Sequence, residues 1–294
     1  MIRKDNSRQF LFLFCFTILL ILPSASAQGI NLTPAGQLDW RIDHAVVVVD
    51  DLNKSIDEFR NAGYSVTSGG EFPGADTHNA LIPFADGSYI ELFAPMDLSL
   101  SYQMKQLIAS GEFDKAMNDL NPLDKRFMLH LAEGPGLRDF ALSAPGINLT
   151  DESTSATLSG LNFSSPVAMS RTGARGNVSY HVIVSEFENQ MAFPFLITDD
   201  TPRSYRVQEV NASYHPNGAT GIGSISVAAA DPSSVLPFYD SLLSGVSKNQ
   251  TQNETVYALN GSSLSILQNS DKSLKDGPAS IMIKDSDGKM IIIP

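Results

Sequence analysis

Apolar residues along the chain follow two spacings, short β-branched runs and stretches with a helical period. Residues 41–50 (RIDHAVVVVD) form a run of the first kind, which is typical of a strand buried on both faces. The apolar residues of 52–62 fall on one helical face, with Asp50 and Asp51 offering an N-cap and Gly63 a C-terminal stop. The pattern predicts a strand followed by an amphipathic helix.

Three further strands are predicted after this helix, at residues 64–68, 77–84 and 88–94. A loop rich in glycine and proline separates the first from the second. The last two flank Asp86-Gly87, a pair that is typical of a tight hairpin turn. Residues 41–97 are therefore predicted to form one βαβββ module.

The same order of elements recurs near the C-terminus. Strands are predicted at residues 221–229, 253–258, 262–267, 279–284 and 289–293, and a helix at 232–243. The two copies align without gaps in two blocks, which place Ser224 on His44 and Ser265 on Glu91. The predicted fold is α+β, with two βαβββ modules, 41–97 and 215–294, forming a cupped mixed sheet.

Residues 98–214 form a long elaboration between the two modules. A helix is predicted at 98–108, and strands at 137–143, 180–185 and 193–198. A segment of this length usually covers a pocket or builds an interface, so a homodimer is one expectation. The sequence leaves open which of the two it does.

The N-terminal segment has the layout of a cleavable export signal. Basic residues precede a short apolar run within residues 1–27, which end in Ala-Ser-Ala, and a polar leader follows at 28–40. We expect a secreted or cell-surface protein with no stable membrane span after cleavage; the alternative is an uncleaved anchor. The only cysteine, Cys15, lies in this segment, so the mature chain has no disulfide and no thiolate ligand.

Asn-x-Ser/Thr sequons are frequent, and on an exported chain they predict a glycoprotein. The alternative is coincidence in a sequence rich in asparagine and serine. The nine sites are Asn31, Asn53, Asn148, Asn162, Asn177, Asn211, Asn249, Asn253 and Asn260.

The formal net charge is -12, and lysine and arginine form no cluster. An acidic surface of this kind repels nucleic acid and anionic lipid, so neither is expected as a partner. A small-molecule ligand or substrate is the remaining expectation.

His44 and Glu91 are polar residues set within apolar strand segments. A buried carboxylate is costly unless it is paired or binds a metal. The pair is therefore either a hydrogen-bonded structural pair in the core or part of a metal site, and a catalytic metal site needs at least one more protein ligand.

The segments HAVVVVDDLNKSIDEFRNAG and GADTHNALIPFADGSYIELFAP resemble the opening module of glyoxalase-like proteins of the vicinal-oxygen-chelate superfamily. The later segments MSRTGARG, AFPFLITDD and YHPNGATGIGSISV resemble the same branch. The resemblance implies that two modules enclose one divalent metal ion, with His44 and Glu91 as ligands from the first. Ser224 and Ser265 depart from this pattern, since a serine hydroxyl is a poor ligand.

Two more histidines lie at positions typical of this branch. His78 or His215 is a possible third ligand, and Glu91 and His78 are the candidate catalytic residues. The alternative for each histidine is a role in structuring a loop. Arg171 either binds an anionic substrate or closes a glycine-rich hairpin.

The resemblance implies a metal-assisted lyase, isomerase or dioxygenase that acts on a small oxygenated molecule. The alternative is a non-catalytic module that binds a small molecule on a degenerate fold, which the two serines favour. Whether the protein is an enzyme stays open at this point.

Overall fold

The computed structural model of the chain describes residues 38–72, 76–173, 176–187, 190–207, 214–269 and 275–291. The predicted signal at 1–27, most of the leader, Asn31 and Asn211 lie outside these residues. Among the described helices, none is long and apolar enough to cross a bilayer.

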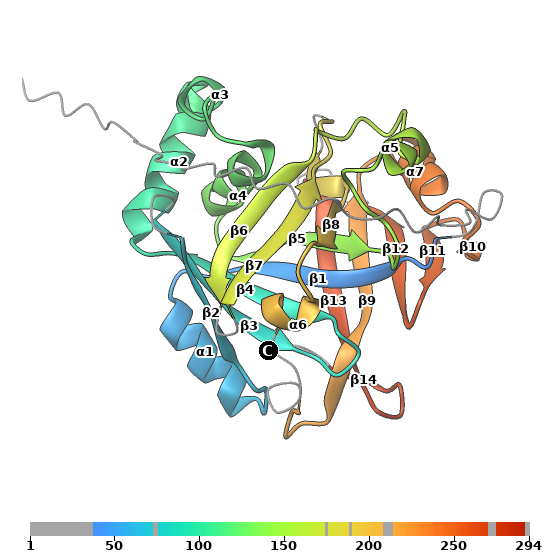
Figure 1. Cartoon of the computed structure of the whole chain (residues 1–294), viewed down its shortest axis with the longest axis horizontal. Coiled ribbons are helices and arrows are strands. Elements are labelled where there is room, and N and C mark those ends of the chain that lie inside the picture. The colour runs from blue at the N-terminus through green and yellow to red at the C-terminus, as the bar shows by residue number, and fades with distance from the viewer. Residues whose placement is uncertain are drawn as a thin grey trace, which may run out of the picture.

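The first βαβββ module has the predicted order and forms half of an eight-stranded curled sheet (Figure 1). The Asp51 side chain caps its helix, and Gly87 takes a positive φ in the hairpin turn, as the sequence predicts. Its elements are β1 (Arg41–Val48), α1 (Leu52–Asn61), β2 (Thr67–Phe72), β3 (Thr77–Pro83) and β4 (Tyr89–Pro95).

The other half of this sheet comes from the predicted elaboration. The strand order β2-β3-β4-β1-β5-β8-β7-β6 is nearly symmetric about the β1–β5 pair, so residues 136–199 form a second βαβββ module. Its elements are β5 (Gly136–Ser143), α5 (Glu152–Thr157), β6 (Val167–Gly173), β7 (Gly176–Ile183), η1 (Gln190–Ala192) and β8 (Phe195–Asp199). Within residues 98–214, α2 (Leu98–Ser110), α3 (Phe113–Ala116), α4 (Pro122–Glu133) and α6 (Arg203–Arg206) are additions to the modules.

The C-terminal module forms a six-stranded sheet of its own, with the order β10-β11-β12-β9-β13-β14. Ser265 lies opposite Ser226 in this sheet as Glu91 lies opposite Val46 in the first, which confirms the internal alignment. The elements are β9 (Ala219–Ala229), α7 (Pro232–Leu242), β10 (Lys248–Gln250), β11 (Glu254–Leu259), β12 (Ser262–Gln268), β13 (Gly277–Asp285) and β14 (Met290–Ile291).

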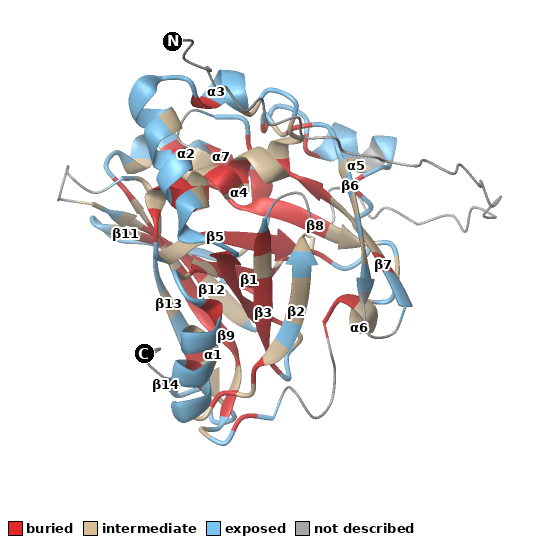
Figure 2. Cartoon of the chain, turned by 90° about the vertical axis from the view of Figure 1, so that its left-hand side faces the viewer, coloured by how far each residue is buried: buried red, intermediate tan, exposed pale blue. Residues whose placement is uncertain are grey.

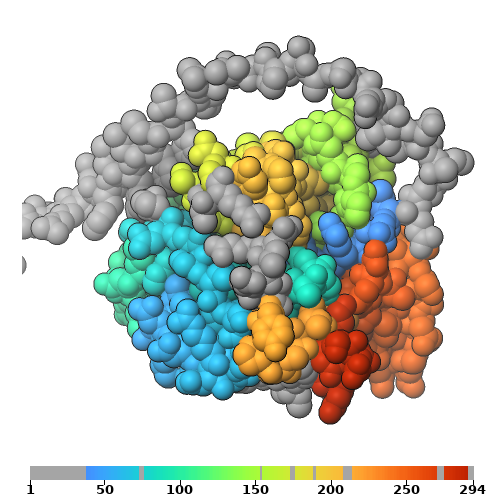
Figure 3. Space-filling view, turned by 60° about the horizontal axis from the view of Figure 1, so that its bottom comes forward, coloured from blue at the N-terminus to red at the C-terminus, as the bar shows by residue number. Residues whose placement is uncertain are grey.

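The α+β class and the curled sheet of βαβββ modules are confirmed. The pairing of the modules differs from the expectation, because residues 41–97 face the module at 136–199 and not the one at 215–294. The C-terminal strands, orange and red in Figure 3, pack beside the first sheet instead. Ser224 and Ser265 are thus not opposite His44 and Glu91.

A large apolar cluster packs on each face of the eight-stranded sheet. The larger one joins its convex face to α1, α7 and the second sheet, through residues such as Phe140, Ile90 and Val227. The smaller one joins its concave face to α2, α3 and α4, through residues such as Val46 and Leu131. Figure 2 shows the buried strands behind the exposed outer faces of α1 and α2. The concave face, covered by α4, holds the candidate site.

Candidate functional site

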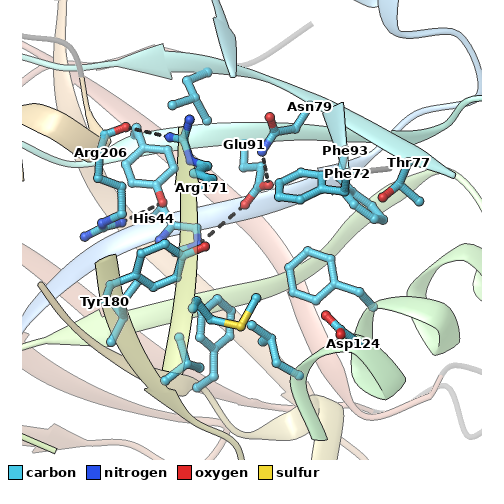
Figure 4. A pocket seen from close by; sticks show the side chains of 18 of the residues that line it. His44, Phe72, Thr77, Asn79, Glu91, Phe93, Asp124, Arg171, Tyr180 and Arg206 are labelled. Carbon is cyan, nitrogen blue, oxygen red and sulfur yellow. Dashed lines mark hydrogen bonds and ion pairs between the residues drawn. The ribbon is translucent and has the colours of Figure 1, made fainter. Parts of the chain in front are cut away.

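A cavity of about 800 Å³, solvent at its mouth included, lies between the concave face of the sheet and α4. Most of its lining is aromatic or aliphatic, and a few polar side chains converge on it (Figure 4). The apolar wall includes Phe72, Phe93, Leu123, Phe127, Met128 and Phe195.

His44 reaches this cavity from a bulge in β1. The β1–β5 register shifts between Ile42 and His44, so Asp43 is not paired in the ladder. A bulge re-aims neighbouring side chains, and here Asp43 Oδ1 lies 2.8 Å from His44 Nδ1. Two residues adjacent in a regular strand would point to opposite faces.

Asp43 is buried and fixed by two arginines from α6. Arg203 Nη1 lies 2.5 Å from Asp43 Oδ2, and Arg206 Nη1 lies 3.1 Å from Oδ1. Burial alone would raise the pKa of Asp43, but the guanidiniums of Arg206 and then Arg203 outweigh it and hold the pKa well below its ordinary value. An ionised Asp43 accepts the Nδ1 proton of His44, so the other ring nitrogen, Nε2, is the one presented to Glu91.

Aromatic contacts fix the plane of the His44 ring. Tyr89 stacks on it with ring centroids 4.4 Å apart, and Phe195 meets it edge-on at 5.2 Å. His44 Nε2 then lies 3.7 Å from Glu91 Oε2. In the neutral ring both atoms are acceptors, so their juxtaposition is stabilised by a proton or a donor between them.

Glu91 is held from its other side by Asn79. The Asn79 amide nitrogen donates to Glu91 Oε1 at 2.5 Å, and both side chains are largely buried. Asn79 Oδ1 is also buried and has no hydrogen-bond partner within the described residues. Asn79 Oδ1 itself packs against Gly69 of β2, so the inner wall offers two acceptor groups, His44 Nε2 and Glu91, to a ligand that carries donors.

Further polar groups of the lining were not singled out from sequence, and they come from separate elements. Tyr180 lies on β7, and burial, followed by the charge of Glu91, raises the pKa of its phenol. Asp124 lies on α4, and burial raises the pKa of its carboxyl although Asn121 donates to it. Figure 4 shows both side chains at the cavity, together with Arg171 and Arg206. No sequence motif marks these positions.

The structure does not bring His78 to this site. Thr77, Asn79 and Leu81 of β3 line the cavity, so His78, between them in the alternation of the strand, points to the other face. Of the candidate catalytic residues, only Glu91 is therefore at the cavity.

His215 also lies elsewhere, and both of its ring nitrogens are in use. Nδ1 accepts the backbone N–H of Ser65 at 2.9 Å, so Nε2 carries the proton and donates to the carbonyl of Pro83 at 2.9 Å. Its ring packs against Tyr64 and Phe84, and burial lowers its pKa. His215 thus ties the segment before β9 to the first module, which is the loop-structuring alternative.

Residues 42–243, more than half of the chain, match the family model described as glyoxalase-like domain. The chain belongs to this glyoxalase-like family. The match confirms the resemblance to the vicinal-oxygen-chelate superfamily that the sequence segments indicate. A search of the curated proteins finds no match.

Solved structures share the glyoxalase-like fold at low sequence identity. A hypothetical protein from Staphylococcus aureus aligns with a TM-score of 0.62 and 16% identity over 84% of this chain and 92% of that one. A xylose isomerase-like TIM barrel/4-hydroxyphenylpyruvate dioxygenase fusion protein aligns with a TM-score of 0.50 and 11% identity, over 89% of this chain and 39% of that one. At these identities the likeness shows the fold alone.

The donor set of this glyoxalase-like cavity falls short of a catalytic zinc site. His44 and Glu91 are two ligands, and β8, the counterpart of β4, lines the cavity with Phe195 and Ile197. Across the described ranges, no group of three His, Cys, Asp or Glu side chains is placed to hold an ion. A catalytic zinc site has three protein ligands, so these residues do not fit one.

Proposed function

We propose that the cavity binds a small oxygenated molecule with an apolar body, and that His44 and Glu91 exchange a proton with it. The observation that carries this proposal is the acceptor pair at the inner wall, Nε2 and Oε2 at 3.7 Å, backed by Asp43. In this pair Asp43 orients the His44 ring, and Glu91 beside it is suited to act as the base that takes a proton from a carbon next to a carbonyl. Isomerase or lyase chemistry on vicinal oxygens is the reaction class that such a pair supports.

The lining also defines the orientation of the ligand. Its hydroxyl oxygens would meet Glu91 and His44, while its apolar body would lie against Phe93 and Phe127. Exclusion of water by the apolar wall strengthens hydrogen bonds to the carboxylate.

The test uses 2-hydroxyacetophenone, which is uncharged and carries vicinal oxygens, an exchangeable methylene and an apolar ring. In D2O with EDTA, the wild-type protein should accelerate deuterium incorporation at the methylene carbon, followed by NMR. Glu91→Gln should slow the catalysed exchange by about 100-fold or more, because general-base catalysis contributes on the order of 10² to 10⁴. Glu58→Gln, on the exposed surface of α1, should leave the rate unchanged.

Binding of the same compound separates catalysis from simple binding. If it binds in a Glu91-dependent manner but no exchange is accelerated, the protein is the non-catalytic module and the proton-transfer proposal is wrong. If EDTA abolishes the exchange and a divalent ion restores it, the reaction depends on a metal, and direct proton exchange by two side chains is wrong.

We further propose that the protein is exported and N-glycosylated, on the signal-like layout of residues 1–27 and the exposure of its sequons. All seven sequon asparagines in the described ranges have exposed side chains: Asn53, Asn148, Asn162, Asn177, Asn249, Asn253 and Asn260. Protein isolated from its source cells should have an intact mass that lacks the first 27 residues and includes hexose units. A full-length, unmodified mass would contradict both export and glycosylation. Association of two copies stays a prediction.

A further inference from the structure

Arg171 places a positive charge at the cavity without a carboxylate partner. It lies on β6, and its Nη1 and Nη2 donate to the carbonyls of Gly69 and Arg206, each at 3.0 Å. Both acceptors are neutral, and no Asp or Glu lies within ion-pair distance of Arg171 in the described part of the chain. The other cavity arginine, Arg206, is neutralised by Asp43 and Asp199.

The two carbonyl contacts hold the Arg171 guanidinium in place before any ligand binds. They join β6 to β2 and to α6, so the side chain bridges the edges of the curled sheet. A fixed, partly desolvated cation is a strong site for an anion, because the cost of ordering the side chain is already met by the fold.

The surrounding charges define where the anion can lie. Glu91 and Asp124 are the cavity carboxylates, and both would repel it. Arg171 and Glu91 both line the cavity, and Figure 4 shows their side chains reaching the same end of it. A ligand anion on Arg171 would therefore have its neighbouring atoms close to Glu91 and His44.

We propose that the ligand is a 2-hydroxy acid with an apolar body, whose carboxylate pairs with Arg171 and whose hydroxyl donates to the His44–Glu91 pair. In a 2-hydroxy acid the carboxylate and the hydroxyl stand on neighbouring carbons. This spacing suits a cavity in which Arg171 lies near the acceptors His44 and Glu91. This inference rests on the proposed function and adds the charge and class of the ligand to it.

The test compares mandelate with mandelamide, which has the same ring and hydroxyl but an uncharged amide, by titration calorimetry. The wild-type protein should bind mandelate more tightly than mandelamide. Arg171→Met should weaken mandelate by about 10- to 100-fold, the usual range for a charged hydrogen bond, and change mandelamide by less than about threefold. Arg171→Lys should retain part of the preference for mandelate, since the charge remains.

Arg138→Met is the matched control. Arg138 also donates to backbone carbonyls, those of Gly134, Glu133 and Pro135, but it does not line the cavity. It should leave the affinities for both compounds unchanged.

Two results would overturn this inference while leaving the proposed function intact. One is a wild-type protein that accelerates exchange in 2-hydroxyacetophenone but prefers mandelamide to mandelate. The other is an equal loss of both ligands in Arg171→Met, which would make Arg171 a structural residue. Absence of binding by mandelate, mandelamide and 2-hydroxyacetophenone together would overturn the proposed function itself.

Discussion

Asp43→Asn is expected to lower the free energy of unfolding by about 3–5 kcal/mol, the usual cost of breaking a buried ion pair. The substitution leaves Arg206, which is 5% exposed, with Asp199 as its remaining carboxylate, and replaces the charged acceptor of His44 Nδ1 by a neutral amide. Urea denaturation followed by the fluorescence of the buried Trp40, the only tryptophan, measures it. Asp57→Asn, on an exposed aspartate of α1, should cost less than about 0.5 kcal/mol.

The effect of Asp43 should also depend on pH. Its pKa in the folded protein lies well below the ordinary value of 3.8, so its stabilisation is complete above that value and is lost as the pH falls below it. The difference in unfolding free energy between wild type and Asp43→Asn should therefore shrink from pH 7 to pH 3. A difference that stays constant over this range would contradict the ionised, paired state of Asp43.

Asp139→Asn should cost a similar amount, about 3–5 kcal/mol, and should also loosen the cover of the cavity. Asp139 accepts from Arg126 Nε at 2.6 Å and from His130 Nε2 at 2.6 Å, and all three side chains are 0% exposed. This cluster fastens α4 to β5, and α4 carries Phe127 of the cavity wall. Denaturation in urea gives the loss of stability, and titration with 2-hydroxyacetophenone should show weaker binding.

A double variant separates the charge from the packing. Arg126→Met combined with Asp139→Leu removes both ions from the core, and such replacements are often neutral or stabilising. It should recover most of the stability that Asp139→Asn loses. If Asp139→Asn itself costs less than about 1 kcal/mol, the cluster is not what fastens α4.

The parts of the fold that the sequence predicts well are those with a regular period. β1 and α1 follow from an apolar run and an amphipathic stretch between Asp51 and Gly63, and the turn at Gly87 follows from its residue pair. α4 escapes prediction because Arg126 and His130 point inward, so polar residues stand at positions of the buried face. The position of α4 over the cavity is therefore not predicted from the sequence either.

The partner of the first module could not be found by self-similarity. The module at 136–199 kept the strand order but not the side chains, since β8 has Phe195 and Ile197 on the face where β4 has Tyr89 and Glu91. The C-terminal module shares the local sequence pattern of the first module but lies in a different sheet. Sequence similarity between repeats therefore indicates that they have the same order of strands and helices. It does not indicate which repeats pair in one sheet, because that depends on contacts that the repeats do not share.

For the site, His44 and Glu91 are brought together at the cavity, while Asp43 is missed for a physical reason. In a regular strand it would face away from His44, and only the bulge reverses this. His78 does not line the cavity, because it alternates along β3 with Thr77, Asn79 and Leu81, which do.

The bulge at Asp43 has a consequence for how this protein can change over time. It makes a single carboxylate serve both as the counter-ion of α6 and as the anchor of the His44 ring. A substitution of Asp43 that changes the orientation of His44 therefore also destabilises the fold. Both effects restrict the substitutions that the inner wall can accept. New ligand preferences are more accessible through the outer wall, where Phe72, Leu123 and Phe127 can vary without touching that ion pair.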